Sequence, residues 1–207
     1  MALKSLYKKS FALAYDIFMF PLEKLGLKKL RKKALKFIKG ETILELGVGT
    51  GLNAFAYPNE IKIIGIERKF EMIERAIKKT QRFKKDVAML CGNVEMLPFK
   101  DEQFDTVFAT FVFCEVKNPK KGFDEIIRVL KPGGRLVLLE HVRPEGKFLS
   151  KIFDLGNKFT SILGENINRT TAETVLEAGF KVERVEKIYD GIVKLIIGTK
   201  PDKVLRS

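Results

Sequence analysis

The spacing of hydrophobic residues divides the chain into two parts. Within residues 1–40, apolar and basic positions interleave, and the apolar positions of residues 27–38 recur at helical spacing with lysines on the other face. From Glu41 onward, short apolar runs typical of buried strands alternate with amphipathic stretches. We therefore expect a basic amphipathic helical arm or lid over residues 1–40 and one α/β domain over residues 41–207.

The second part predicts a regular succession of elements. Strands are expected at residues 42–46, 61–66, 87–90, 105–109, 135–140, 181–188 and 192–198. Helices are expected between the first strand and Pro58, around residues 72–77, over 121–130, and from a capping box at Thr170 and Glu173 to Gly179. Turns are expected at Lys131-Pro132-Gly133-Gly134 and at Asp190-Gly191. This alternation predicts a mostly parallel sheet covered by helices, and the terminal hairpin adds one antiparallel strand.

Charge is concentrated in the arm. The chain has a formal net charge of +13, and residues 1–40 contain eleven basic residues but only two acidic ones. For residues 27–38 a solvated helix packed on the core is the favoured interpretation. For the segment before them we expect an arm that lies on an anionic membrane surface or covers an active site. Nucleic acid is the other common partner of such a basic segment.

Other features limit the class of protein. No run of about 18 uncharged apolar residues is present. The apolar stretch from Phe11 to Pro21 carries Asp16 and lacks a small-residue cleavage site, which argues against a secretory signal. We expect Cys91 and Cys114 to be buried free thiols in a reducing cytoplasm. One histidine and scattered acidic residues predict no metal site.

A glycine-rich loop follows the first expected strand. Residues 43–53 read ILELGVGTGLN, and a loop of this kind lets a ligand approach the backbone closely. The dinucleotide fingerprint requires a glycine where Leu52 stands, so a pyrophosphate is disfavoured. Glu67 lies 20 positions beyond Gly47, at the end of the second strand, where a carboxylate can accept both hydroxyls of a ribose. The loop and Glu67 together predict a nucleoside site at the switch point of the sheet.

Five motifs in order resemble a known family. They are Glu45-x-Gly47-x-Gly49-x-Gly51, Glu67, Asn93-Val94-Glu95 before Leu97-Pro98-Phe99, Phe104-Asp105, and Leu130-Lys131-Pro132-Gly133-Gly134. Over residues 41–144 this series is similar to class I S-adenosylmethionine-dependent methyltransferases. The resemblance implies a Rossmann-like, seven-stranded, mostly parallel sheet with a reversed last strand and helices on both faces. One departure is Asn93, which stands where the family often has aspartate, so no charge is expected there.

The resemblance also implies the roles of individual residues toward S-adenosylmethionine. The three loop glycines would hold its methionine part against backbone, and Glu45 would help to hold its ammonium. Glu67 would take the ribose, while Met72 and Val94 would pack on the adenine or, equally well, belong only to the core. The expected cofactor-binding residues are Tyr15, Glu45, Gly47, Gly49, Gly51, Asn53, Glu67, Arg68, Met72, Asn93, Val94, Glu95 and Thr110.

Methyl transfer requires an aligned and deprotonated acceptor. His141 follows the fifth strand on the ligand side of the sheet, and an imidazole there can take a proton at neutral pH. Tyr15 and Asp16 of the arm are the expected catalytic partners. Alternatively, His141 only forms a hydrogen bond with a loop.

Three phrases narrow the acceptor. Tyr15-Asp16, residues 139–144 (LEHVRP) and residues 168–170 (NRT) are similar to bacterial phospholipid N-methyltransferases, quinone C-methyltransferases and membrane-associated thiol methyltransferases. The apolar residues 110–113 (TFVF) stand where amino-methylating DNA enzymes carry an acidic or amide residue before two prolines, which disfavours nucleic acid. We expect a cytoplasmic enzyme, peripheral on membranes, that N-methylates a phosphatidylethanolamine-type amine. Quinone-precursor C-methylation, thiol S-methylation and a non-catalytic cofactor-binding module remain open, as does the oligomeric state.

Overall fold

The computed structural model describes residues 2–59, 61–141 and 171–202. The helical elements are α1 (Ala2–Leu22), the π-helical turn η1 (Glu23–Leu27), α2 (Lys28–Leu35), the 3₁₀ turn η2 (Ala54–Ala56), α3 (Phe70–Arg82), α4 (Pro119–Val129) and α6 (Thr171–Glu177). The strands are β1 (Thr42–Leu46), β2 (Lys62–Glu67), β3 (Val87–Cys91), β4 (Phe104–Thr110), β5 (Leu130–His141), β6 (Lys181–Ile188) and β7 (Val193–Thr199).

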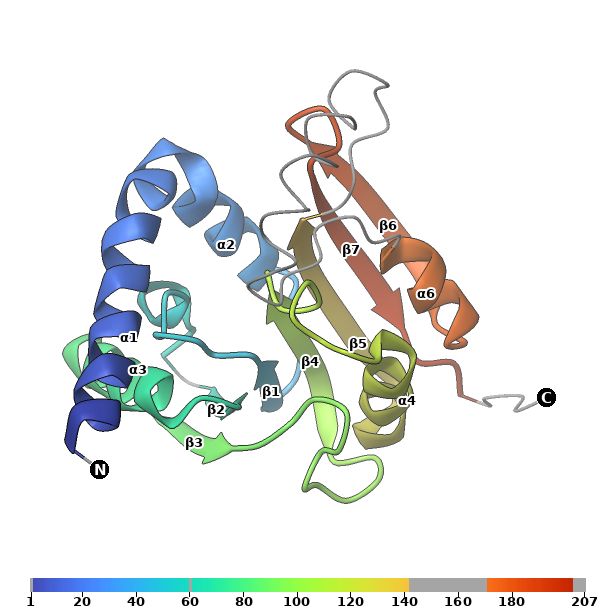
Figure 1. The fold of residues 1–207 in the computed structure, drawn as a ribbon. Helices are drawn as coiled ribbons and strands as arrows, with labels where there is room; N and C mark the ends of the chain where they lie inside the picture. The colour runs from blue at the N-terminus through green and yellow to red at the C-terminus, as the bar shows by residue number, and fades with distance from the viewer. Residues whose placement is uncertain (1, 60, 142–170, 203–207) are drawn as a thin grey trace.

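The seven strands form one sheet in the order β3-β2-β1-β4-β5-β7-β6 (Figure 1). Strands β1 to β5 are parallel, whereas β7 lies antiparallel between β5 and β6. The predicted mostly parallel sheet with a reversed last strand is confirmed. The chain passes from β1 to β2 on one side and later to β4 on the other, so a crevice opens at the carboxyl end of β1.

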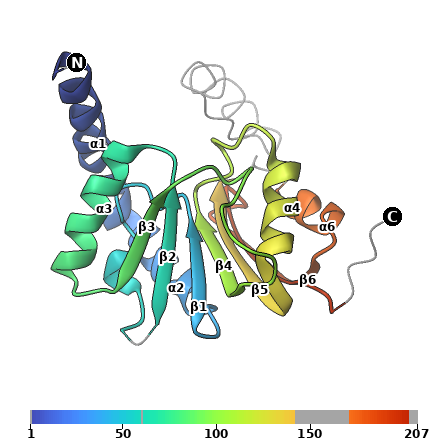
Figure 2. The same ribbon diagram turned by 90° about the horizontal axis from the view of Figure 1, so that it is seen from below.

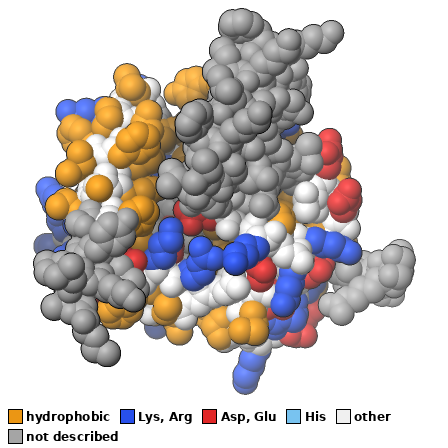
Figure 3. All heavy atoms as spheres, in the orientation of Figure 1, with side chains coloured by type: hydrophobic (Ala, Val, Ile, Leu, Met, Phe, Trp, Pro, Cys, Tyr) orange, Lys and Arg blue, Asp and Glu red, His pale blue; other side chains and the backbone are white. Residues whose placement is uncertain are grey.

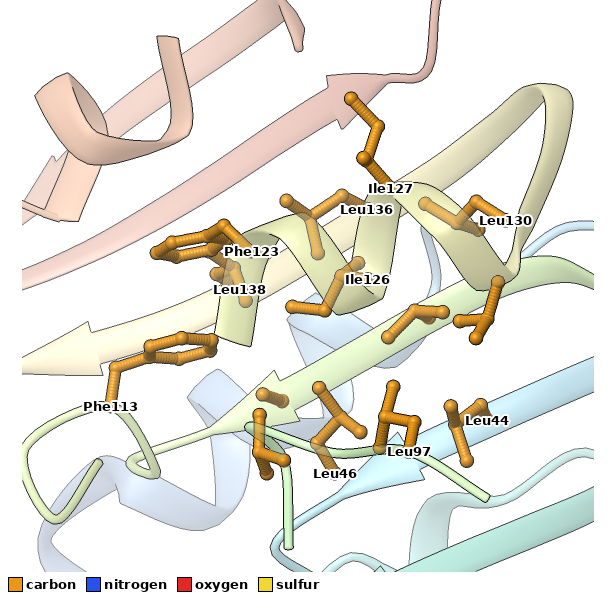
Figure 4. Packing of buried hydrophobic residues seen from close by; sticks show 14 of the residues in the cluster. Leu44, Leu46, Leu97, Phe113, Phe123, Ile126, Ile127, Leu130, Leu136 and Leu138 are labelled. Carbon is orange, nitrogen blue, oxygen red and sulfur yellow. The ribbon is translucent and has the colours of Figure 1, made fainter. Parts of the chain in front are cut away.

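Two apolar layers hold the helices to the two faces of the sheet. Helices α4 and α6 cover one face (Figure 2), and Phe123 and Ile126 of α4 lie against strand residues such as Leu136 and Leu138 (Figure 4). Helix α2 and η2 pack on the other face. Alternate strand residues serve the two layers, since Leu44 belongs to the first and Ile43 to the second.

Some boundaries differ from the expectations. The helix expected after the glycine loop is a single 3₁₀ turn. Helix α4 begins at Pro119 because the side chain of Asn118 caps it. The expected turn at residues 131–134 lies within β5, since Leu130 already pairs with Phe104 before the register shifts. Thr170 of the expected capping box and residues 142–170, which include the phrase at residues 168–170, lie outside the described residues.

The cysteines correct one expectation. Neither takes part in a disulfide in the described structure, but Cys91 is exposed and Cys114 only half-buried. Cys91 ends β3, and the neighbouring Leu90 is exposed as well. Because β3 is an edge strand, part of it remains uncovered.

The arm lies over the domain. Helix α1 contacts α3, with Ala12 and Met19 buried. Helices α1 and α2 are separated by a kink at Gly26, whose φ is 149°. This backbone conformation is strained for a residue with a side chain, so the kink favours glycine, and the hydroxyl of Tyr189, which follows β6, lies against it. None of the described helices is long and apolar enough to cross a membrane.

Candidate active site

A cavity opens at the carboxyl ends of β1, β2 and β4. The cavity is open to solvent, and its empty space, with the solvent at its mouth included, is about 870 Å³. The lining residues are Tyr15, Arg31, Gly47, Val48, Gly49, Thr50, Leu52, Ile66, Glu67, Arg68, Lys69, Met72, Gly92, Asn93, Val94, Glu95, Thr110, Phe111, Val112, Glu115 and Val116. The arm therefore supplies two side chains to a cavity otherwise built by the sheet domain.

The glycine loop forms one wall of the cavity. Gly49 has a φ of +58°, and a Cβ placed there meets no atom closer than 3.9 Å. Its backbone is therefore open to a ligand. Gly51 serves packing instead, because a Cβ there would lie 2.8 Å from the Cα of Ala76 in α3. The third glycine of the motif therefore lets the loop pack closely on α3.

Glu67 ends β2 with its carboxylate at this loop. Its Oε2 accepts a hydrogen bond from the backbone N–H of Gly49 at 3.0 Å, and its Oε1 accepts one from the N–H of Lys69 at 2.9 Å. Each carboxylate oxygen can accept more than one hydrogen bond. The geometry therefore holds a carboxylate in place and leaves it able to accept further donors, such as the two hydroxyls of a ribose.

Glu45 lies beneath the loop and not in the cavity lining. It is 1% exposed and accepts hydrogen bonds from the amide of Asn53 at 2.7 Å and from the hydroxyl of Tyr57. Burial raises the pKa of Glu45 to about 7, although both hydrogen bonds and the charge of Arg31 oppose the rise. The carboxylate of Glu45 therefore does not reach the cavity in which the ammonium of a cofactor was expected.

Arg31 is a cavity residue that the sequence analysis missed. It is only 3% exposed, and its Nη1 donates to the hydroxyl of Thr110 at 2.7 Å and to Oδ1 of Asn53 at 3.2 Å. Its Nε donates to Glu23 at 2.8 Å. A lysine-rich helix gives no signal for a buried arginine. The one sequence feature that could have indicated a buried Arg31 is its place on the apolar face of the helix, next to Leu30 and Ala34.

Asp16 of α1 contacts α3 and does not line the cavity. It accepts hydrogen bonds from the hydroxyl of Thr50 at 2.6 Å, from Nε of Arg75 at 2.8 Å and from Lys79 at 2.7 Å. Burial raises the pKa of Asp16, but the hydrogen bonds from Lys79, Thr50 and Arg75 outweigh this effect, so the pKa is lowered. The carboxylate is therefore an ionised clamp between the arm and the domain.

His141 does not line the cavity and is separated from it by the ring of Phe111. Its imidazole stacks on Phe111 with the ring centroids 4.3 Å apart, and Phe111 itself lines the cavity. Burial, together with the charge of Arg31, lowers the pKa of His141 to about 4. The imidazole is neutral at pH 7, yet the described structure does not bring it to the cavity wall.

The expected site residues fall into two groups, those that line the cavity and those that do not. Tyr15 projects from the arm into the cavity lining. The expected residues that line the cavity are Tyr15, Gly47, Gly49, Glu67, Arg68, Met72, Asn93, Val94, Glu95 and Thr110. Those outside the lining are Asp16, Glu45, Gly51, Asn53 and His141. Within the part of the chain that the structure describes, no cluster of three or more His, Cys, Asp or Glu residues could hold a metal ion.

Comparison with known proteins identifies the family. A family model described as a methyltransferase domain matches residues 44–138. The phosphatidylethanolamine N-methyltransferase of Cereibacter sphaeroides is 32% identical over 67% of this chain and 71% of its own. The ubiquinone/menaquinone biosynthesis C-methyltransferase of Francisella tularensis subsp. novicida is 30% identical over 92% of this chain and 88% of its own. The chain belongs to the class I S-adenosylmethionine-dependent methyltransferases.

A solved methyltransferase structure agrees with this membership. An S-adenosylmethionine-dependent methyltransferase from Thermotoga maritima is 25% identical and superposes with a TM-score of 0.71, covering 93% of this chain and 97% of its own. The expected Rossmann-like fold, the expected enzyme class and the expected cofactor, S-adenosylmethionine, are thus confirmed.

Proposed function

We propose that this methyltransferase transfers a methyl group to a lipid-borne amine of the phosphatidylethanolamine type. The observation that carries the proposal is the arm, which exposes an apolar surface on one side and contributes Tyr15 to the cavity on the other. An arm of this kind can bring a membrane-bound acceptor to the cavity. The similarity to a phosphatidylethanolamine N-methyltransferase supports the same acceptor.

We propose that the cofactor lies across the carboxyl end of β1. Glu67 accepts the ribose hydroxyls, and the backbone at Gly49 contacts the part of the cofactor beyond the ribose. The buried side chains of Met72 and Val94 lie in the same cavity and offer apolar contact to the adenine. The bound cofactor supplies a sulfonium methyl group that is open to in-line displacement. The chain itself supplies position and the exclusion of water.

The cofactor placement is tested by calorimetry with S-adenosylhomocysteine. Removal of charge-assisted hydrogen bonds in Glu67→Ala should weaken binding by roughly tenfold to a hundredfold. Asp124→Ala is the matched control, since Asp124 is an exposed acid on α4 outside the cavity lining. Equal affinity in parent and Glu67→Ala would contradict the placement.

The acceptor is tested with radiolabelled S-adenosylmethionine and vesicles of defined composition. We expect methylated lipid from vesicles that contain phosphatidylethanolamine and none from otherwise identical phosphatidylcholine vesicles. Label in a demethylated quinone and not in the lipid would instead favour C-methylation, the second candidate, which the similarity to a quinone C-methyltransferase over 88% of its length supports. If neither the lipid nor the quinone is labelled but a small hydrophobic thiol is, the result would favour S-methylation.

We propose that the arm binds anionic membrane surfaces. Hydrophobic side chains gather over α1, at the left of Figure 3. Among residues 11–27, where the side chains are described, the exposed large ones are Phe11, Leu13, Ile17, Phe18, Phe20, Leu22 and Leu25. Leu25 is 79% and Phe18 is 70% exposed. Exposure of these apolar side chains to water is unfavourable, and their insertion between lipid headgroups would remove this free-energy cost. The exposed residues Lys24, Lys28 and Lys29 lie close to Leu25 in the sequence, and each can add about 1 kcal/mol of attraction to an anionic surface.

Vesicle flotation tests the membrane proposal. Binding should require anionic lipid and should fall as salt rises, because salt screens the lysine contribution. The double variant Phe18→Ser/Leu25→Ser should float at least about tenfold less, from the lost burial of two large side chains. Phe83→Ser removes an exposed phenylalanine outside the arm and serves as the control. Equal flotation on neutral vesicles would refute the proposal.

A further inference from the structure

Arg31 is held rigidly at one corner of the cavity. The guanidinium lies 5.0 Å above the ring of Phe111 and donates through Nε and Nη1 to three side chains from different parts of the chain. Glu23 is the one acidic residue in ion-pair contact with it among the residues that the structure describes. A buried arginine with its planar fork fixed in advance is well suited to a carboxylate, because little side-chain entropy is lost on binding.

The sheet topology places this corner opposite Glu67. Glu67 ends β2, Thr110 ends β4, and β1 lies between these strands. Neighbouring strands are about 4.8 Å apart, so the ends of β2 and β4 are separated by roughly 10 Å. Thr110 and Arg31 therefore lie across β1 from Glu67, within reach of the amino-acid substituent of a nucleoside whose ribose is bound at Glu67.

We propose that Arg31 binds the carboxylate of the methionine part of the cofactor and thereby couples cofactor binding to closure of the arm. The inference rests on the proposed position of the ribose at Glu67. Arg31 belongs to α2, while Asn53 and Thr110 belong to the sheet domain. A carboxylate at this corner joins the two parts through charge-assisted hydrogen bonds, which stabilises the closed arm. A cofactor without the carboxylate occupies the nucleoside part of the cavity but leaves the arm less tightly held.

A comparison of two ligands separates this role from a structural one. S-adenosylmethionine and its decarboxylated form share the adenosine, the sulfonium and the amine, and they differ in the carboxylate. The parent should prefer S-adenosylmethionine by about thirtyfold, the worth of a charge-assisted pair of about 2 kcal/mol. Arg31→Gln should lower affinity for S-adenosylmethionine by that factor and should change affinity for the decarboxylated form by less than about threefold.

Two further measurements strengthen the test. Glu23→Gln removes the ion-pair partner while keeping the guanidinium, and it should retain the preference for the carboxylate-bearing ligand. Hydrogen exchange of the amides in residues 11–35 should slow when S-adenosylmethionine binds the parent, but not when it binds Arg31→Gln.

Each result has one meaning. Equal weakening of both ligands by Arg31→Gln would overturn the assignment and leave Arg31 as a tie between α2 and the domain. Arm protection by the decarboxylated ligand equal to that by S-adenosylmethionine would overturn the coupling. Unchanged S-adenosylmethionine affinity in Glu67→Ala overturns the cofactor placement, and with it the inference. Loss of affinity there with no carboxylate preference in the parent overturns the inference alone.

Discussion

Buried Glu45 and half-buried His141 should give opposite slopes to the pH dependence of stability. Burial raises the pKa of Glu45 from 4.5 to about 7, whereas burial and Arg31 lower that of His141 from 6.5 to about 4. Between pH 4.5 and 7 the folded chain keeps a proton on Glu45 that the unfolded chain loses, so stability falls as pH rises. Between pH 4 and 6.5 the unfolded chain protonates His141 and the folded chain does not, so stability rises with pH.

The two effects should nearly cancel in the parent between pH 4.5 and 6.5. Each shift is close to 2.5 pH units, and at about 1.4 kcal/mol per unit each group changes the free energy of unfolding by about 3 kcal/mol. Glu45→Gln removes one slope, so its stability relative to the parent should rise by about 3 kcal/mol from pH 4.5 to 7. His141→Phe removes the other, so its relative stability should fall by a similar amount from pH 4 to 6.5.

Urea unfolding followed by circular dichroism at half-unit steps from pH 4 to 7.5 measures both curves. Only the difference in stability between variant and parent is compared, because the other carboxylates titrate equally in all three proteins. Asp105 is an example: burial raises its pKa, but hydrogen bonds from Lys131 and Thr42 outweigh this effect and lower it. A flat difference curve for Glu45→Gln would show that the carboxyl titrates normally in the fold. Slopes of the same sign in both variants would refute the opposing pair.

Three further results are expected. Tyr15→Phe should keep cofactor affinity and lower turnover by about tenfold or more, because Tyr15 lines the cavity and His141 does not. A larger loss of turnover in His141→Ala than in Tyr15→Phe would instead support His141 as the base. Asp16→Asn should cost about 1–3 kcal/mol of unfolding free energy and speed hydrogen exchange in α1, since the ionised clamp to α3 is weakened; unchanged exchange would contradict the clamp. In thermal unfolding, Gly51→Ala should destabilise the protein by at least about 1 kcal/mol more than Gly191→Ala. Both glycines have positive φ, but only a Cβ at Gly51 would meet another atom, the Cα of Ala76 at 2.8 Å. Equal losses of stability would show that backbone strain accounts for the whole effect.

The sequence by itself determined the sheet and half of the site. Strands β1 and β2 are short, mostly apolar segments, and the residues at the ends of such segments lie at the carboxyl edge of a parallel sheet. Glu67 and the backbone of Gly49 could therefore be placed together from spacing alone. The same reasoning gave the terminal hairpin, because the turn at Asp190-Gly191 has a local chemical signature.

Tertiary structure decided what the arm does and which carboxylates face a ligand. Glu45 follows the same pattern as Glu67, but Asn53 and Tyr57 fold back over it, and this burial depends on the path of the chain after the loop. Arg31 and Asp16 acquire their partners from residues far along the sequence. Helical periodicity separates a polar from an apolar face. A charged side chain on the apolar face becomes part of a site only when distant parts of the chain meet it, as Asn53 and Thr110 meet Arg31 here.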